Sequence, residues 1–537
     1  MTAVQCVRRT RIATTLVFVG ASLVVGFSPI ADAAPTVITD AEGYRFEVDP
    51  DDPGGGATAV GRGPGPHPTV AAIPGTVDHE GVVYDVKRIG VGAFTNVGTW
   101  ANSVVIPPEV EVIHDRAFRR TSGAGLPTVT FSDGSALQAI GEYAFAYNAL
   151  TAVELPTTMR TLGPNAFMNN EITSLRLNEG LEAVPDHAFV GNDLDGEVVI
   201  PDSVQSIGRY AFAHNVTLDS LVIGADTTSI GEYAFTQAFG PGQLAGIQFG
   251  SAVETIGKHA FSYNSLTSVT FPDSLRSIGD DAFWNNGMST VTFGSGFETM
   301  GARAFSQNSI EHVVFPATLT AIGSQAFDIQ RIDGVVRGPR TATMLGPIPT
   351  IVRGSGWGSF DGSRTWNDPA TVTNIHYRAE FGADDETVGY TDPHWMDYPT
   401  IPLFPVTFDL NGHGDSFVVD VLRDELVAEP DDPTADGYAF SAWSASAEGD
   451  AGSFPFDDPI EEATTAYAVW EEEPASTPAP TPTAPVTSPG STAPPASPVD
   501  SGPAAAEEPV DPQPAALQSV TLSVPATPTV AQPAFTG

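Results

Sequence analysis

The chain repeats one pattern of apolar and polar positions many times, as in IGEYAFAYNALTAVELP (140–156) and IGKHAFSYNSLTSVTFP (256–272). In the first half of each copy, IGxxAF, the Ile, Ala and Phe positions are apolar. In the second half the last three residues alternate inward, outward and inward, as VEL does at 153–155, which predicts a short strand with one buried face. Each copy therefore predicts one strand and one return segment.

An Ala-Phe pair marks the copies, and successive phenylalanines are 22 to 27 residues apart. A period of about 20–29 residues with this order of apolar positions is typical of a leucine-rich-repeat solenoid. One coil cannot bury its own apolar face, so each must pack on its neighbours. We therefore expect about eleven coils of 22–27 residues with short parallel strands, and a spine of stacked phenylalanines at Phe94, Phe118, Phe145, Phe167, Phe189, Phe212, Phe235, Phe261, Phe283, Phe305 and Phe327.

Two polar or small positions of the copy have an expected structural role. The Gly of IGxxAF is interpreted as permitting a turn that a side chain would strain. An Asn follows Phe by three residues in seven copies, and an inward amide can satisfy the backbone groups of a tight loop. Repetition then predicts a ladder, although a simple turn-forming role is the alternative, at Asn148, Asn170, Asn192, Asn215, Asn264, Asn286 and Asn308.

The outward position of the predicted strands forms the candidate binding face. It is polar, weakly charged and short of aromatic residues, so it lacks the Trp, Tyr and Arg anchors of a tight protein hot spot. Its members are Glu154, Arg176, Gln248, Thr270 and Thr292, with Val222 and Val314 at the same position.

These motifs resemble the BspA-like (Treponema-type) leucine-rich repeats of bacterial surface proteins, which share the strand, the IGxxAF segment and the Asn. The resemblance places the solenoid at residues 69–336, and TVAAIPGTVDHEGVVYDVKRIGVGAF (69–94) matches the usual start of such arrays. It implies attachment to extracellular or host-surface proteins.

The flanking segments are expected to close the solenoid, because an open end would expose its spine. We expect an N-terminal cap at residues 34–68 and a C-terminal cap region at 337–400. The second is rich in Gly, Trp and Tyr, so a sugar platform formed by Trp357, Trp366 and Trp395 is the alternative interpretation.

Residues 401–472 resemble the Listeria–Bacteroides repeat, a small β-grasp-like module, through VTFDLNGHG, GYAFSAW and TTAYAVW. Short alternating strands joined by Gly, Asp and Pro turns agree with this. Tyr438, Phe440, Trp443 and Trp470 are expected to anchor its core, with a sugar platform as the alternative.

Residues 473–537 hold many prolines with abundant Ala, Thr and Ser, which predicts a disordered stalk. The final PAFTG faintly resembles the end of a sortase sorting signal, so attachment to a cell wall stays open.

The first 33 residues predict a secretory signal peptide rather than a membrane anchor. They combine a basic start, a short apolar run over 12–27, and Ala31-Asp32-Ala33, which fits a cleavage site. The only cysteine, Cys6, lies inside this segment, so the mature protein is expected to have no disulfide. Because the apolar run belongs to the signal peptide, no transmembrane segment is expected in the mature chain. With 65 acidic against 23 basic residues, the net charge of −42 argues against nucleic-acid partners.

No residue pattern predicts catalysis. His187 and His259 occupy a position that is Tyr143, Asp281 or Arg303 in other copies, so we interpret it as solvent-facing rather than metal-binding. NDLDG (192–196) lacks the later ligands of a calcium loop and is interpreted as a turn. No nucleophile elbow, HExxH or Walker motif occurs.

We therefore expect no catalytic residue, no cofactor and no metal site. The function predicted from the whole sequence is a secreted or cell-surface, non-enzymatic adhesion or protein-interaction protein. Its partner is expected to be an extracellular or host-surface protein, and its oligomeric state stays open. The alternative is an extracellular glycan-binding module.

Overall fold

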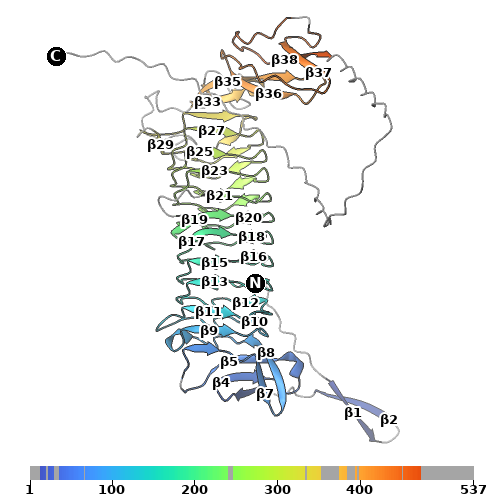
Figure 1. Cartoon of the computed structure of the whole chain (residues 1–537), viewed down its shortest axis with the longest axis vertical. Coiled ribbons are helices and arrows are strands. Elements are labelled where there is room, and N and C mark those ends of the chain that lie inside the picture. The colour runs from blue at the N-terminus through green and yellow to red at the C-terminus, as the bar shows by residue number, and fades with distance from the viewer. Residues whose placement is uncertain are drawn as a thin grey trace, which may run out of the picture. The chain divides into compact units, whose positions relative to one another are not determined.

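The protein is described here from a computed structural model (Figure 1). The structure describes residues 12–19, 22–29, 35–65, 67–239, 246–332, 335–351, 374–383, 394–395, 398–449 and 452–472. Among these residues the regular structure consists of β-strands and the short 3-10 turns η1 (Pro53–Gly55), η2 (Val97–Thr99) and η4 (Ala379–Phe381). No helix in this part of the chain is long and apolar enough to cross a membrane.

The strand half of each copy forms the first column of the solenoid. Within a coil the inner residue is buried and its neighbours are exposed, as at Val153 between Ala152 and Glu154. Pairing is parallel and, as far as β25, falls into separate sheets of two or three strands. The strands are β6 (Val70–Ala72), β9 (Ser103–Ile106), β11 (Thr128–Phe131), β13 (Ala152–Glu154), β15 (Ser174–Arg176), β17 (Asp195–Val199), β19 (Thr217–Val222), β21 (Gly246–Gln248), β23 (Ser268–Thr270), β25 (Thr290–Thr292), β27 (His312–Phe315), β31 (Thr341–Met344) and β33 (Asn374–Arg378).

A second column of parallel strands, which the sequence pattern did not predict, lies just before the position that Gly occupies in most copies. It is more regular than the first, with one unbroken run from β16 to β32. In the two-residue members from β10 to β28 the second residue is buried and the first is partly or fully exposed, as Ile207 and Ser206 are. The strands are β8 (Val82–Ile89), β10 (Val112–Ile113), β12 (Ala139–Ile140), β14 (Thr161–Leu162), β16 (Ala183–Val184), β18 (Ser206–Ile207), β20 (Ser229–Ile230), β22 (Thr255–Ile256), β24 (Ser277–Ile278), β26 (Thr299–Met300), β28 (Ala321–Ile322) and β32 (Thr350–Ile351).

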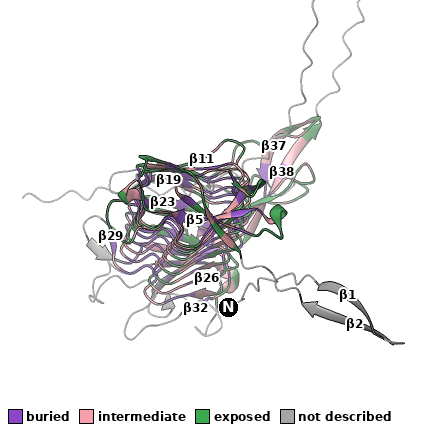
Figure 2. Ribbon diagram, turned by 90° about the horizontal axis from the view of Figure 1, so that it is seen from below, coloured by how far each residue is buried: buried purple, intermediate pink, exposed green. Residues whose placement is uncertain are grey.

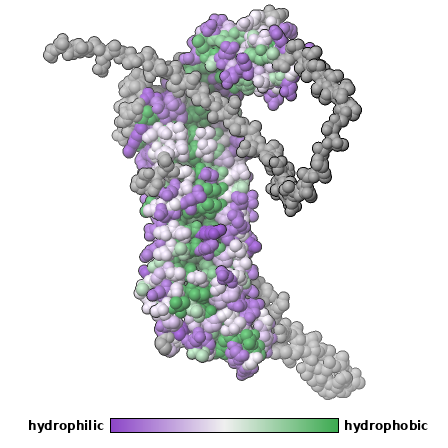
Figure 3. Space-filling view, in the orientation of Figure 1, coloured by the Kyte–Doolittle hydropathy of each residue, from purple (hydrophilic) through white to green (hydrophobic). Residues whose placement is uncertain are grey.

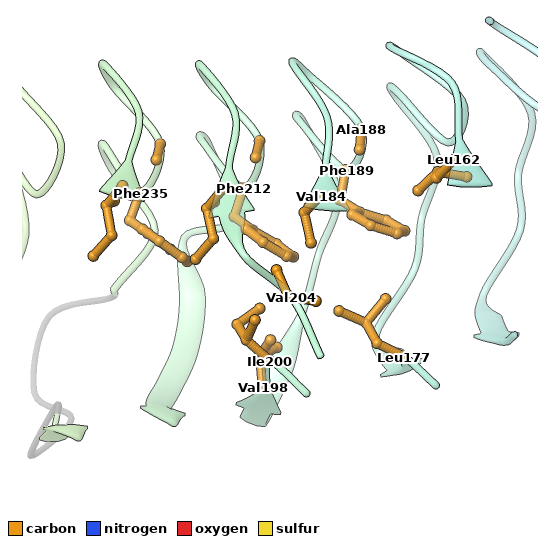
Figure 4. Packing of buried hydrophobic residues seen from close by; sticks show 14 of the residues in the cluster. Leu162, Leu177, Val184, Ala188, Phe189, Val198, Ile200, Val204, Phe212 and Phe235 are labelled. Carbon is orange, nitrogen blue, oxygen red and sulfur yellow. The ribbon is translucent and has the colours of Figure 1, made fainter. Parts of the chain in front are cut away.

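The eleven spine phenylalanines form one stack inside the coils. Successive ring centroids are 5.0 to 5.5 Å apart and the ring planes differ by only 2° to 13°. Figure 4 shows Phe189, Phe212 and Phe235 in successive coils. Viewed along the stack, buried residues fill the interior and exposed residues lie outside (Figure 2). Burial of large rings in contact with both neighbours makes this spine a main source of stability.

A second aromatic column lies at the inward end of the later strands. Phe249, Phe271, Phe293 and Phe315 follow one another at 5.5 to 5.6 Å. Each also meets a spine ring edge to face, for example Phe271 with Phe283 at 5.4 Å and 70°. Seen from the side, a hydrophobic band runs along the coils between hydrophilic margins (Figure 3).

The role expected for the Gly of IGxxAF is wrong. The backbone of this Gly is not in the left-handed region in any coil, from Gly90 to Gly323. Instead it lies against the preceding coil: a Cβ on Gly163 or Gly208 would be 2.5 Å from the backbone nitrogen of Glu142 or Asp186. Glycine is therefore needed because the coils approach closely, and the turn itself is made by other residues.

An N-terminal sheet closes the first end of the stack. β3 (Thr36–Thr39), β4 (Tyr44–Val48) and β5 (Ala57–Arg62) pair antiparallel, and β5 then pairs with β8, which also pairs with β7 (Thr76–His79) and β10. The ring of Tyr44 meets Phe94 edge to face at 6.2 Å, so it covers the first spine ring. A separate hairpin of β1 (Ile12–Val19) and β2 (Ser22–Pro29) lies in the predicted signal peptide.

At the other end, β35 (Tyr398–Asp409) belongs to two structures at once. Its first part pairs with β33 of the solenoid, and its second part pairs with β36 (Phe417–Leu422) and β38 (Thr464–Glu472). β37 (Tyr438–Ser444) completes this module by pairing with β38. The short hairpins β29 (Gln330–Ile332) with β30 (Val335–Arg337), and β34 (His394–Trp395) with β35, complete the strands.

The module has its own core around Phe408 and Trp443. Phe440 and Trp470 are half-buried and pack against this core, but Tyr438 does not belong to it and lies 4.2 Å from the ring of His413. The expectation that Tyr438 anchors the core is therefore wrong. The predicted stalk at 473–537, Trp357 and Trp366 lie outside the described residues, as does the side chain of Trp395.

Candidate interaction surfaces

The Asn residues that follow the spine form a ladder between coils. The Oδ1 of Asn170 accepts a hydrogen bond from the Leu150 backbone N–H at 3.2 Å, and its Nδ2 donates to the carbonyl oxygens of Phe145 and Phe167, both at 3.0 Å. One amide thus joins its own coil to the preceding one. The same arrangement holds for Asn148, Asn192, Asn215, Asn286 and Asn308, and in altered form for Asn264.

Gln330 occupies the next position of the ladder, which the sequence pattern missed. It lies three residues after Phe327, accepts from the Ile310 N–H at 2.9 Å and donates to the Phe305 carbonyl at 2.8 Å. Its spacing from Phe327 was the available signal. The ladder is a structural device, because its amide groups are turned into the solenoid.

The predicted binding face is exposed but divided. Glu154 and Arg176 are register partners on β13 and β15, and they form an ion pair at 3.4 Å with 72% and 79% of their side chains exposed. Thr270 and Thr292 are register partners on β23 and β25. Gln248 lies on β21, in a different sheet from both pairs. The structure therefore brings these residues together two at a time rather than on one continuous sheet.

A different surface gathers the aromatic and basic side chains. We define the corner face as the residues two before and two after the spine phenylalanines from Phe118 to Phe327. It contains Arg116, Tyr143, Asn165, His187, Tyr210, Tyr233, His259, Asp281, Arg303 and Gln325, and Arg120, Tyr147, Asn169, Gly191, His214, Gln237, Tyr263, Asn285, Gln307 and Ile329.

Nineteen of these twenty residues adopt a left-handed backbone, with φ between 51° and 66°; Arg120 is the exception. This conformation costs about 1 kcal/mol or more for a residue with a Cβ, and Gly or Asn would avoid most of that cost. Where Tyr, His or Arg occupies these turns, contacts of its side chain must therefore offset the cost of the left-handed backbone. These contacts are present.

His187, Tyr210, Tyr233 and His259 stack on one another across four coils, with ring centroids 5.1, 4.6 and 4.6 Å apart. Burial lowers the pKa of His187 and of His259, and for His259 the nearby Asp281 opposes this effect. The prediction that this position faces solvent holds only in part: each ring covers part of the next, but the four rings stay half-buried at the surface and the Arg303 side chain is 49% exposed.

Asp281 continues the column and is buried, with 1% of its surface exposed. Both of its oxygens accept hydrogen bonds from Arg303 at 2.7 Å, and His259 Nε2 lies 3.5 Å away. The bond to Asp281 raises the pKa of Arg303. A bidentate pair between neighbouring coils explains the buried carboxylate, and it makes this cluster a structural one.

Neither His187 nor His259 has enough neighbouring ligand side chains for a metal site. In the part of the chain that the structure describes, no group of three or more His, Cys, Asp or Glu side chains could hold a metal ion. Within NDLDG, Asn192 belongs to the ladder and the Asp195 side chain accepts from the next backbone N–H, at the start of β17.

The sequence analysis missed one further cluster, which joins Arg116 and Arg120 of the corner face to Arg119, the residue directly after Phe118. Arg116, Arg119 and Arg120 fall within five residues, and the guanidinium of Arg119 lies 5.0 Å from the Tyr143 ring centre and 5.4 Å from that of Tyr147. Arg116 lies 5.8 Å from the Tyr143 ring centre. The close spacing of three arginines in an acidic chain was the signal that could have found it.

The stacked coils, the inward Phe and Asn positions and the paired short strands define a leucine-rich-repeat solenoid followed by a small β module. The BspA type leucine rich repeat region model matches residues 87–218 and 236–336 in six copies, and the Listeria-Bacteroides repeat domain model matches 404–469. The chain thus carries BspA-type leucine-rich repeats and a Listeria–Bacteroides repeat domain.

The chain also matches solved structures, among them those of three bacterial proteins. The pneumococcal vaccine antigen PcpA is 18% identical over 65% of this chain and 94% of its own, with a TM-score of 0.41. A leucine rich cell surface protein from Faecalibacterium prausnitzii A2-165 is 22% identical over 59% and 90%, with a TM-score of 0.36. The T. pallidum leucine rich repeat protein is 17% identical over 50% and 88%, at 0.21. No curated protein matches the chain.

Proposed function

We propose that this protein is an extracellular, non-enzymatic adhesion protein whose solenoid binds a protein partner. The observation that carries the proposal is the distribution of side chains. The interior positions are occupied by the spine and the ladder, whereas five tyrosines, three histidines and three arginines gather on the corner face. Tyr, Trp and Arg are the residues that most often anchor protein interfaces.

The extracellular location is supported by the signal-peptide features of residues 1–33 and by the BspA-type repeats. The Pro-rich segment after residue 473 would serve as a stalk that holds the solenoid away from a cell wall. Amino-terminal sequencing of the secreted protein tests the first point, with Ala34 expected as its first residue.

The non-enzymatic role is supported by the chemistry of the described ionisable groups. The groups with altered pKa values on the corner face, His187, His259 and Arg303, all stack or pair with neighbours in the adjacent coils. A hydrolase screen of the secreted protein is expected to show no turnover. Turnover that co-purifies with the protein would refute this part of the proposal.

The direct test is a binding assay with the full secreted chain on a biosensor surface. Purified extracellular-matrix proteins and a glycan array are the probes. Saturable binding to a protein, with no glycan bound, is the expected result. Binding to glycans alone would reject the proposal in favour of the alternative.

That alternative, glycan binding, has one observation in its favour. In the module, His413 lies 4.2 Å from the Tyr438 ring and 5.2 Å from the Trp470 ring, and all three are at least partly exposed. The Trp470 Nε1 donates to the Leu410 carbonyl at 2.9 Å, which fixes its ring. A Tyr438→Ala variant that loses glycan binding would support this second function.

A further inference from the structure

Arginine side chains in the solenoid usually pair with a carboxylate one coil away. Arg176 with Glu154, Arg209 with Glu232, and Arg276 with Glu298 are examples. Arg119 departs from this pattern. Among the described residues no ion pair joins it to a carboxylate, and no hydrogen bond engages its guanidinium. Its Nε is buried, so the two Nη groups are the donors that remain for an anion.

Two tyrosines hold the Arg119 guanidinium in place. It lies over the rings of both Tyr143 and Tyr147, at 5.0 and 5.4 Å from their centres. Stacking of this kind fixes the plane of the guanidinium and leaves its N–H groups directed along that plane, where they suit a carboxylate. Because the side chain is already ordered, less entropy is lost when an anion binds.

The surrounding charges leave the cluster positive. Arg116, Arg119 and Arg120 contribute three positive charges, against one each from Asp115 and Glu142, so three minus two leaves a net charge of +1. Glu142 lies 4.0 Å from Arg116, and Asp115 accepts a hydrogen bond from the Glu142 backbone. Neither carboxylate is engaged with Arg119. The cluster is thus a local positive site on a chain whose net charge is −42.

A fixed loop lies beside the cluster. The 27-residue spacing from Phe118 to Phe145 is the longest in the solenoid, and the added residues make an exposed segment at 121–124. Asn96 accepts hydrogen bonds from the backbone N–H groups of Thr121 and Ser122, at 2.6 and 2.9 Å, which ties this loop to the preceding coil. A ligand at the arginines would meet an ordered rim with exposed hydroxyl groups.

Charge and geometry favour a short acidic peptide segment over an anionic polysaccharide. A long polyanion would extend beyond the cluster and be repelled by the acidic remainder of the protein. A sugar platform also needs an exposed ring face, whereas the Arg119 guanidinium lies over both tyrosines. A single exposed acidic segment of a protein could place one or two carboxylates at the cluster without either cost.

We propose that Arg116, Arg119, Arg120, Tyr143 and Tyr147 form the anchor for an acidic segment of the protein partner, with a carboxylate bound by Arg119. This assignment rests on the proposed function, because it requires that the partner be a protein. It locates binding beside the corner face rather than on the predicted binding face of the outward strand positions, called the strand face from here on.

The test measures binding of the full secreted chain to three immobilised probes. They are a short glutamate–tyrosine peptide, a glutamine–tyrosine peptide of equal length, and a heparin oligosaccharide. The acidic peptide is expected to bind about tenfold more tightly than the neutral one, because charge-assisted hydrogen bonds contribute more than neutral ones. Equal binding of the two peptides, binding of heparin alone, or no binding of any probe would overturn the anchor.

Two variants and a matched control assign the effect to the cluster. Arg119→Gln and Arg120→Gln are each expected to weaken binding of the acidic peptide about fivefold or more, in the range of one lost charged hydrogen bond. Arg176→Gln removes the same charge from the strand face and is expected to leave binding unchanged. A loss with Arg176→Gln as large as with Arg119→Gln would indicate only a general charge effect and refute the site.

The Arg119→Lys variant separates stacking from charge. It keeps the positive charge but loses the planar fork, so it is expected to bind the acidic peptide less tightly than the parent. The proposed function is checked separately on the matrix-protein panel. If the parent and Arg119→Gln bind a matrix protein equally, the anchor is wrong and the adhesion function stands; if the parent binds no protein, the adhesion function itself fails.

Discussion

Replacing Asn215 by Ala tests whether the amide ladder holds the coils together. Its side chain is fully buried, accepts from the Leu194 N–H at 3.3 Å, and donates to the carbonyl oxygens of Phe189 and Phe212 at 3.1 and 2.8 Å. Alanine would leave these three backbone groups without their partner. Each such loss costs about 1–3 kcal/mol in a buried site, so the free energy of unfolding is expected to fall by about 3–5 kcal/mol.

Asn286 provides a matched control within the same ladder. It accepts from Leu266 at 3.2 Å and donates to Phe261 and Phe283 at 2.9 and 3.0 Å, but it is only half-buried. Water can replace part of what Asn286→Ala removes, so this variant is expected to lose about half as much stability or less. The difference between the two variants isolates burial from hydrogen-bond count.

Urea unfolding followed by far-ultraviolet circular dichroism measures both losses. A solenoid can unfold in parts, so hydrogen exchange at the Leu194 and Leu266 amides should accompany the global measurement. Faster exchange at Leu194 is expected in the Asn215→Ala protein. A loss below about 1 kcal/mol for Asn215→Ala, or an equal or larger loss for Asn286→Ala, would refute this account of the ladder.

Three further predictions concern the spine, the coil contacts and the C-terminal strands. Phe212→Ala should lower the free energy of unfolding by about 3–5 kcal/mol, and an unchanged thermal melt would contradict the stacked spine. Gly208→Ala should cost about 1–3 kcal/mol through its clash with the preceding coil, whereas Gly246→Ala, whose Cβ meets nothing within 4 Å, should melt like the parent. Burial lowers the pKa of His376 to about 4, with a smaller contribution from His312, so its contribution to stability is present above the ordinary value of 6.5 and is lost as the pH falls toward 4. The free energy of unfolding is expected to fall by about 3 kcal/mol. Urea titrations at pH 7 and pH 4 should show this loss in the parent but not in His376→Gln. Identical pH profiles of the two proteins would disprove the prediction.

Much of the fold could be predicted from the sequence because the apolar positions recur at the period of the coil. The spacing of Phe212 and its equivalents identified the spine, and the alternation at Val153 and Glu154 identified the first strand column. Both features repeat along the chain, and each copy supports the interpretation of the next. The module was recognisable from its own motifs and from strand alternation, and Phe408 and Trp443 lie in its core.

The interaction surfaces were less predictable. The outward strand positions could be predicted from alternation, but that local pattern did not show that their residues fall into separate sheets. The corner face could not be read in this way, since a position that is Tyr210 in one coil is Asp281 in another. Only the stacking of neighbouring coils shows that these residues contact one another.

The sequence by itself determined the repeated coil, its inward residues and the order of the modules, since burial of an apolar face leaves a periodic trace. The tertiary structure decided what depends on contacts between coils. It showed that Gly163 serves close approach rather than a turn, that Gln330 extends the ladder, and that Arg119 rests on two tyrosines. Such contacts join residues about one coil apart, and their register follows from how each coil packs on the last, which no local pattern records.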